Sequence, residues 1–405
     1  MSENSTAQGR GIGKKIAKVT AIILLSVFIF LFLLVTVTYI ISIVDGKKVK
    51  ARQIEYIQSL QAAYAAGEIS PVDEQSFCSF DLSEADSIPY NQVRFLATHN
   101  SYKGKENKYS RVINGILASI TDNGWESFAY YFDSLTEQLN SGLRSIELDA
   151  YARKDGSFEG SHHPIMDKSG HAYEISLALE ELAMWSDNNP DHLPITILLE
   201  PKVWYIPLGG HDFKEQDYIN LDKLLREKLG ERLCEPNDIL GDYADFQAMR
   251  EDNGWPSLEQ LRGKFLIMLH PNSKMPKYFK LHPDMRDAAM FPAYDRRDVK
   301  LSSEQLRHTC FAISNFPLTD SELIAEYAAQ NYVVRTRLGL YPDFEPDCIE
   351  AGMNSQANIL STDFPARNVN LDKYDYQIKG IIDSYTVTLK GQTKDNLSTY
   401  RLADN

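Results

Sequence analysis

The sequence predicts an α/β protein whose main domain is a closed barrel of eight parallel strands interleaved with helices. Between about residues 85 and 370, short apolar runs of strand length alternate with segments of helical periodicity, and eight such runs can be counted. Several runs end in residues suited to chemistry rather than packing, as expected where parallel strands present their carboxyl ends at one rim. These two observations favour a (β/α)8 barrel, the TIM-barrel fold, over an open sheet.

One transmembrane helix is expected before the barrel. Residues 1–18 form a basic N-terminus, and residues 19–44 are twenty-six positions without a charge. About twenty apolar residues span a bilayer, whereas the apolar region of a cleaved signal peptide has about 7–15. We therefore expect a retained single-pass anchor. Four Lys/Arg lie on each side of it, so charge does not orient it. The commoner arrangement leaves the N-terminus in the cytoplasm and the folded body outside.

The remaining elements follow in order along the chain. Residues 45–84 are polar and predict a stalk with a helical piece at 51–66. Helices are expected at 125–140, 175–188 and 221–229. The expected strands are 93–97, 143–149, 160–163, 195–200, 264–269, 311–315, 332–336 and 358–362. The third of these is the weakest pattern, and the region 271–310 has a loop-rich composition. The barrel domain would occupy 85–370, and residues 371–405 would form an extension that covers one end.

Charge and cysteine content exclude some classes of protein. The formal net charge of −14 argues against a nucleic-acid partner. The cysteines lack the C-x-x-C spacing of a zinc or thioredoxin-like site; they are Cys78, Cys234, Cys310 and Cys348. Their even number suits disulfides outside the cytoplasm, and it suits buried free thiols equally well, so it does not decide the compartment. The sequence gives no oligomeric state.

Oxygen-bearing side chains gather at the ends of the expected strands. They are Asn100, Glu147, Asp149 and Glu200. Three carboxylates in one cleft would repel one another and raise each other's pKa unless a cation neutralises them. Ca²⁺ with oxygen ligands resolves this repulsion, and Mg²⁺ fits less well because it keeps several waters. The alternative is that Glu147 and Asp149 pair with nearby arginines such as Arg144 or Arg153.

Two histidines accompany the acidic residues. His99 follows the first expected strand, and His162 follows the third. Two imidazoles beside one phosphodiester can act as general base and general acid, because the imidazole pKa lies near the working pH. His163 points the other way on an extended chain, so one of the neighbouring pair should face the substrate. His270, at the end of the fifth expected strand, could line the same pocket.

Basic side chains on this rim would bind a phosphate. Lys202 lies just past Glu200, and Arg335 and Arg337 alternate at the end of the seventh expected strand, which places both on one side of it. The alternative for each is a salt bridge to the acidic surface.

Together these motifs resemble the calcium-dependent phosphatidylinositol-specific phospholipase C family. The resemblance covers roughly residues 85–370 with the motifs in order. They are Ala-Thr-His-Asn-Ser-Tyr at 97–102, Gln-Leu-Asn-Ser-Gly-Leu-Arg-Ser-Ile-Glu-Leu-Asp at 138–149, His-His-Pro at 162–164, Trp-Ser-Asp-Asn-Asn-Pro at 185–190, Leu-Pro-Ile-Thr-Ile-Leu-Leu-Glu at 193–200, Arg-Thr-Arg at 335–337 and Ile-Leu-Ser-Thr-Asp-Phe-Pro at 359–365.

The resemblance implies a TIM-barrel phosphodiesterase that cleaves phosphatidylinositol, a phospholipid in the membrane, to diacylglycerol and an inositol cyclic phosphate. It implies that His99 assists proton removal from the inositol 2-hydroxyl or stabilises the pentacoordinate phosphorus. His162 would protonate the leaving oxygen, and it is preferred to His163 because the family pattern reads His-x-Pro. The four oxygen donors at the strand ends would hold Ca²⁺ as a Lewis acid.

Two other functions stay open. A glycerophosphodiester phosphodiesterase would also use a barrel with a Glu-x-Asp pair such as Glu147 and Asp149, although that family usually begins with His-Arg-Gly, where this chain has His99-Asn-Ser. A membrane-anchored binding protein with a degenerate site is the other possibility, and none of the six core positions is lost. The chain has no EF-hand loop or obvious lipid-binding module, and the headgroup and acyl preference are not encoded in any pattern we recognise.

Overall fold

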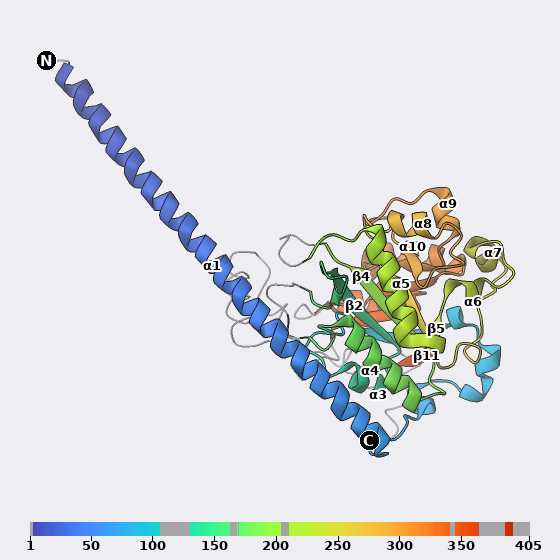
Figure 1. Ribbon diagram of the computed structural model, residues 1–405. Helices are drawn as coiled ribbons and strands as arrows, with labels where there is room; N and C mark the ends of the chain where they lie inside the picture. Colours follow the sequence, from blue (N-terminus) through green and yellow to red (C-terminus); the bar gives the residue numbers. More distant parts are fainter. Residues whose placement is uncertain are drawn as a thin grey trace.

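The computed structural model describes residues 3–105, 130–162, 168, 170–203, 210–340, 345–363 and 385–391. In Figure 1 a long helix lies along one side of a rounded body and projects well past it. The body holds the barrel.

Eight parallel strands close into a barrel, which confirms the predicted (β/α)8 fold. They are β1 Val93–Thr98, β2 Ser145–Ala152, β4 Ile195–Pro201, β6 Phe265–Leu269, β7 Phe291–Tyr294, β8 Phe311–Ile313, β9 Val333–Arg337 and β10 Ile359–Thr362. Closure comes from β1, which pairs in parallel with β10 on one side and with β2 on the other. Every residue of β1 and β2 is buried, because side chains fill the barrel on one face and helices cover the other.

Three short strands extend the sheet. β3 (Phe158–Glu159) runs antiparallel to β2, β5 (Leu233–Cys234) pairs with β6, and β11 (Val387–Leu389) runs antiparallel to β1. β11 belongs to the predicted C-terminal extension, most of which lies outside the described residues.

One strand prediction was wrong, and one barrel strand was missed. The segment 160–163 is not a barrel strand; the hairpin strand β3 ends just before it, and His163 lies outside the described residues. The missed strand is β7, inside the region expected to be rich in loops. Its sequence is Phe-Pro-Ala-Tyr, and proline in so short a run argues against a strand because it cannot donate to the ladder.

The helices surround the barrel. They are α3 Leu135–Asn140, α4 Ile175–Asn188, α5 Glu215–Leu229, α6 Pro236–Leu240, α7 Phe246–Glu251, α8 Pro276–Leu281, α9 Ser303–Arg307, α10 Pro317–Ala329 and α11 Pro346–Asn354. The expected helix 175–188 coincides with α4, and 221–229 lies within α5. The expected helix 125–140 is shorter over its described part: Ser134 and Glu137 form a capping box that starts α3. Residues 130–134 are therefore not helical.

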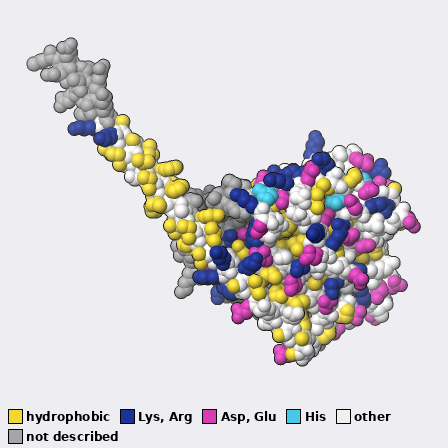
Figure 2. All heavy atoms as spheres, in the orientation of Figure 1, with side chains coloured by type: hydrophobic (Ala, Val, Ile, Leu, Met, Phe, Trp, Pro, Cys, Tyr) yellow, Lys and Arg dark blue, Asp and Glu magenta, His cyan; other side chains and the backbone are white. Residues whose placement is uncertain are grey.

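The first helix, α1, runs from Glu3 to Ala65. Among the described residues, its stretch Ala17–Ala65 is the one helical segment long and apolar enough to cross a membrane. A signal sequence near the N-terminus would pass the same test. Figure 2 shows hydrophobic side chains around its projecting part. Beyond this part, Val49, Ile57 and Leu60 are each 5% exposed, and α1 contacts α4. The segment expected to be a stalk therefore begins with a helix that packs against the barrel.

The cysteines are free thiols. Cys78, Cys234 and Cys310 are buried, and Cys348 is half-buried.

Candidate active site

A cavity of about 270 Å³ opens where the carboxyl ends of the barrel strands meet, and we call this end of the barrel the rim. Its lining comprises His99, Asn100, Glu147, His162, Glu200, Lys202, His270, Asp295, Arg297, Asp298, Asn315, Phe316 and Arg337. Seven of the nine site residues predicted from the sequence are among them. The other two, Asp149 and Arg335, are buried at 0% and 2% exposure. The structure thus brings most of these residues together around one cavity, although two of them do not reach its surface.

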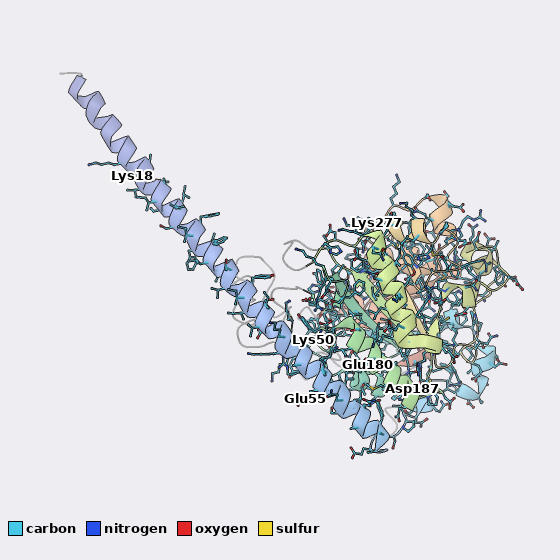
Figure 3. The ribbon with its side chains drawn as sticks, viewed as in Figure 1. Lys18, Lys50, Glu55, Glu180, Asp187 and Lys277 are labelled. Atoms are coloured by element: carbon cyan, nitrogen blue, oxygen red, sulfur yellow. The ribbon has the colours of Figure 1, made fainter. Side chains whose placement is uncertain are left out.

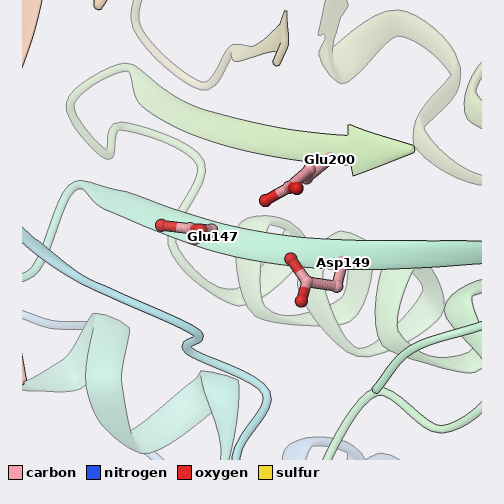
Figure 4. A group of neighbouring side chains, drawn as sticks. All are labelled: Glu147, Asp149 and Glu200. Atoms are coloured by element: carbon pink, nitrogen blue, oxygen red, sulfur yellow. The ribbon is translucent and has the colours of Figure 1, made fainter. Parts of the chain in front are cut away.

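Three carboxylates form a cluster at this cavity, two of them in its lining. Glu147 and Asp149 lie on β2 and Glu200 on the adjacent β4, where Asp149 and Glu200 are register partners. Figure 4 shows the three side chains on these two strands. One ligand oxygen from each lies within 4.8 Å of the others, which is close enough for all three to share one ion.

Protein cations neutralise the cluster. The Lys202 Nζ lies 3.2 Å from Asp149 Oδ2 and 2.9 Å from Glu200 Oε1. The Arg335 Nη2 lies 2.5 Å from Glu147 Oε2, and its Nη1 donates to Asn315 Oδ1 at 2.7 Å. These contacts place Arg335 beneath the cavity rather than on its surface.

Local charges lower the pKa values of Glu147 and Glu200. Burial by itself raises the pKa of Glu147, but Arg335 and His99 outweigh it, so that the pKa is lowered. Burial likewise raises the pKa of Glu200, and His270 and Lys202 outweigh it. Both groups are therefore ionised at neutral pH.

The arginines considered as alternative partners lie elsewhere. Arg144 is buried and pairs with Glu74. Arg153 pairs with Glu159 and Glu174. Neither of these arginines is a partner of the cluster among the described ion pairs.

The cluster fits a calcium ion. Asp149 Oδ1 is buried and has no hydrogen-bond partner in the described part of the chain. The Tyr102 hydroxyl lies 2.9 Å from Asn100 Oδ1 and 2.5 Å from Asp149 Oδ2, so it holds the amide and the carboxylate together. An unused buried carboxylate oxygen beside two further carboxylates and an amide is the ligand set that a hard divalent cation prefers.

His99 is oriented by a carboxylate from the last barrel strand. Its Nδ1 lies 2.9 Å from Oδ1 of Asp363, the residue after β10, and Asn100 Nδ2 lies 3.3 Å from His99 Nε2. An acceptor at Nδ1 and a donor at Nε2 favour the tautomer with the proton on Nδ1. Asn100 has a φ of 51°, a left-handed turn that asparagine tolerates, and both it and His99 line the cavity.

His162 approaches the same carboxylate cluster. Its Nδ1 lies 3.2 Å from Asp149 Oδ2, and its carbonyl oxygen accepts a hydrogen bond of 2.9 Å from the Tyr151 hydroxyl. About a third of the side chain is exposed. Asp149 therefore contacts both a candidate proton-transfer group and the candidate ion site.

Comparison with known proteins decides the family. The family model described as Ca²⁺-dependent phosphoinositide phospholipase C matches residues 88–164 and 158–385. The chain belongs to this family. The bacterial calcium-dependent phosphoinositol-specific phospholipase C of Pseudomonas sp. is 19% identical, with a TM-score of 0.52 over 72% of this chain and 96% of that one. The calcium-dependent phosphatidylinositol-specific enzyme of Streptomyces antibioticus is 18% identical, with a TM-score of 0.51 over 75% of this chain and 100% of that one.

These structural likenesses show the fold. A comparison with curated protein sequences finds no significant match. Because members of this phospholipase C family depend on Ca²⁺, the calcium predicted from the acidic cluster agrees with the family.

Several residues that line this cavity or contact its histidines were missed from the sequence. Asp295, Arg297 and Asp298 follow β7, and they were missed because β7 itself was missed. Asp363 stands in a quoted motif, but its role becomes visible only when barrel closure brings β10 beside β1. His270 does line the cavity, as suggested by its place after an apolar run.

Proposed function

We propose that the protein is a membrane-anchored phosphodiesterase that cleaves phosphatidylinositol-type lipids to diacylglycerol and inositol (cyclic) phosphate. One observation carries the proposal: two histidines, each held by a carboxylate, line one cavity with an ion-binding cluster. That arrangement supplies a base, an acid and a charge-neutralising group for one phosphodiester.

The four oxygen donors, Asn100, Glu147, Asp149 and Glu200, would hold Ca²⁺. When bound, the ion would act as a Lewis acid that polarises the phosphate and stabilises its developing charge. The cluster needs little rearrangement for this, because its carboxylates are already gathered and the pKa values of Glu147 and Glu200 are lowered. Lys202 contacts two of the carboxylates that would bind the ion, Asp149 and Glu200. Its ammonium group would therefore move away from them, toward the phosphate, when the ion binds.

His99 would accept the proton of the attacking hydroxyl. Asp363 accepts the hydrogen bond from Nδ1–H, which puts the lone pair on Nε2. The substrate hydroxyl would replace Asn100 Nδ2, which lies 3.3 Å from Nε2. The same carboxylate stabilises the imidazolium that forms, as in other carboxylate–histidine pairs.

His162 would protonate the leaving oxygen. Its Nδ1–H is held by Asp149, and Nε2 is then the nitrogen that donates. Because the side chain is partly exposed, a proton can be replaced from solvent after each turnover.

Arg337 is the best placed basic group for binding the phosphate. It lines the cavity, and its Nε is buried without a hydrogen-bond partner among the described residues. Arg335, predicted for the same role, we now propose as a positioning residue that keeps Glu147 charged and in place.

The apolar part of α1 would anchor the protein, with the barrel outside the cytoplasm. The uncharged run and its exposed apolar side chains support the anchor.

The deciding experiment uses the full chain in detergent micelles or liposomes that contain phosphatidylinositol. Turnover should require Ca²⁺, stop with chelator, and fall at least about a thousandfold in His99→Ala and His162→Ala, in line with the loss of a general acid or base. His282→Ala, at a histidine paired with Asp222 and Asp287 outside the cavity, is the matched control and should retain activity.

Three results would overturn the assignment. Full activity in chelator would exclude the calcium role. Hydrolysis of glycerophosphoinositol in preference to the lipid would favour a glycerophosphodiester phosphodiesterase. Calcium binding without turnover of any phosphodiester would favour an inactive binding protein.

A further inference from the structure

We infer that the barrel-packed part of α1 fixes the catalytic rim toward the bilayer that holds the preceding apolar residues. This inference rests on the proposed membrane anchor. We call residues 38–65 the bracket, because they would hold the barrel rigidly relative to the anchor. They replace the stalk expected from the sequence.

The bracket is a stripe of buried residues along one face of α1. They recur every three or four positions and are Thr38, Ser42, Gly46, Val49, Gln53, Ile57 and Leu60. This spacing is the repeat of a helix face. By contrast, the large apolar side chains of residues 19–34 that the structure describes are more than a third exposed. Helix α1 is thus continuous from an exposed apolar part, suited to contact with lipid, to a part that packs against the barrel.

The upper part of the stripe contacts the rim. Gly46 lies so close to the Tyr173 ring that a Cβ there would clash with the hydroxyl. Lys50 Nζ lies 3.1 Å from Glu174 Oε1, and Figure 3 shows Lys50 beside the barrel, with Lys18 far out on the projecting part. The Gln53 amide accepts a bond from the Glu174 N–H at 2.9 Å and donates to the Glu174 carbonyl at 3.2 Å.

The segment that makes these contacts with α1 belongs to the rim. Residues 170–174 come after His162 and lead into α4, and Glu174 bridges to Glu159 at the end of the β3 hairpin. Gln53 also donates to the carbonyl of His171, whose N–H bonds the carbonyl of Tyr102 beside the site.

The chain that follows α1 contacts the far end of α4. The Val72 N–H donates to Asn189 Oδ1 at 2.8 Å, and Asn188 Nδ2 lies 3.4 Å from the carbonyl oxygen of Ile69. Gln53 therefore meets the start of α4, and residues 69–72 meet its end. The two helices run in the same direction.

This direction determines which end of the barrel faces the membrane. Helix α4 connects the parallel strands β2 and β4 and so runs opposite to them. The strands consequently point toward the N-terminal end of α1, and the apolar residues project past the rim, not past the base. Figure 1 shows this projection.

The length of helix between the exposed apolar residues and the first rim contact places the rim at the membrane surface. About 14 Å of helix separates Val37 from Gly46 at 1.5 Å per residue, which is comparable with the thickness of a headgroup layer. Outside α1, the large apolar side chains that the structure describes as exposed are Ile219, Phe316 and Leu318. The last two lie at the start of α10 on the rim, and Phe316 lines the cavity.

A rigid bracket has a thermodynamic advantage over a flexible tether. A tether only raises the local concentration of the barrel near the lipid, whereas a bracket also removes the orientational freedom that productive binding would otherwise cost. Turnover of substrate in the same membrane should therefore be faster than the same catalytic groups would achieve on a flexible tether.

The test compares two insertions of the same flexible ten-residue Gly-Ser segment in the full chain. The first, between residues 37 and 38, leaves the bracket packed on the barrel but separates it from the anchor. The matched control lies after Gly67, an exposed turn with no atoms crowding its Cβ position. It lengthens the chain equally while α1 stays packed on the barrel.

The geometric readout places a fluorophore at the rim (Leu318→Cys) or at the base (Asp86→Cys) of the protein in liposomes carrying a headgroup quencher, in a Cys348→Ser background. We expect quenching at the rim to exceed quenching at the base by at least threefold. The difference should disappear after the first insertion and persist after the control. Equal quenching at the two positions in the parent, or persistence of the difference after the first insertion, would overturn the inference.

A second readout separates this inference from the proposed function. The first insertion should lower turnover of phosphatidylinositol in the same liposome about tenfold, while turnover of a soluble short-chain substrate is unchanged. Loss of neither rate would overturn the inference. A parent without turnover on either substrate would reject the proposed function, and the quenching pattern would still decide the orientation. A protein that does not enter liposomes would reject the anchor and the inference together.

Discussion

Two buried carboxylates in this molecule have pKa values shifted in opposite directions. Glu147, on the rim, has Arg335 at 2.5 Å, and its pKa is lowered although burial raises it. Glu181, on α4 beneath α1, accepts one backbone bond from Thr136 at 2.8 Å, but its other oxygen has no partner in the described part of the chain. Burial raises the pKa of Glu181 to about 7.

The difference separates a functional acid from a structural one. A buried acid keeps its charge only where a cation offsets desolvation, and otherwise it retains its proton. Charge is therefore concentrated where it can bind an ion, and it is suppressed where a helix covers the barrel.

The largest expected effect comes from removing the cation. Arg335→Met would leave Glu147 buried without its partner, and we expect the unfolding free energy without Ca²⁺ to fall by about 3–5 kcal/mol. Denaturant unfolding of the full chain in chelator measures this. The double variant Arg335→Met/Glu147→Gln should recover most of the loss and remains measurable if the single variant does not fold. Equal stability of the single variant and the parent would contradict the ion-pair role.

The second effect concerns pH and Glu181. Its folded pKa of about 7 lies above the ordinary glutamate value of 4.5, so the stability it contributes is complete below the unfolded pKa and is lost as pH rises toward 7. Glu181→Gln removes this loss, and we expect it to stabilise the protein by about 2 kcal/mol at pH 8 and by almost nothing at pH 4.5.

Thermal unfolding at the two pH values checks this prediction. Glu180→Gln, at the half-exposed neighbouring position that is paired with Lys228, is the control and should show no comparable pH dependence. A constant difference between Glu181→Gln and the parent at both pH values would rule out titration of Glu181.

The smallest expected effect sharpens the comparison at the rim. Lys202 holds Asp149 and Glu200 in the ion's absence, so its charge opposes a second cation. We expect Lys202→Met to bind Ca²⁺ roughly tenfold more tightly, because a like charge a few ångströms away is removed. Calorimetric titration measures the affinity. Lys168→Met, which removes a lysine of similar exposure that is paired with Glu159, should leave it unchanged, and weaker binding in Lys202→Met would contradict the argument.

The sequence identified most of the barrel because seven of its eight strands carry recognisable apolar runs. It missed β7 because Pro292 interrupts a four-residue strand whose pairing with β6 and β8 comes from the surrounding fold. The expected strand at 160–163 was wrong because the chain there leaves a two-residue hairpin instead of entering the barrel.

The site was predictable where its residues lie at the end of an apolar run in the sequence, as Glu147, Asp149 and Glu200 do. The pairing of His99 with Asp363 was not predictable in this way, since it depends on contact between the first and last barrel strands. The packing of α1 was hidden for a different reason. Its buried face is built partly from Thr38, Ser42, Gly46 and Gln53, which leave no apolar periodicity to detect.

The way α1 covers α4 has a practical consequence for preparing this protein. A soluble fragment that starts near residue 70 would strip the cover from α4, hydrate Glu181 and uncover the apolar surface that Val49, Ile57 and Leu60 now shield. Expression of such a fragment should yield aggregates. A fragment that starts near residue 45 instead keeps the part of α1 that covers this surface. It is the fragment to use in crystallisation trials.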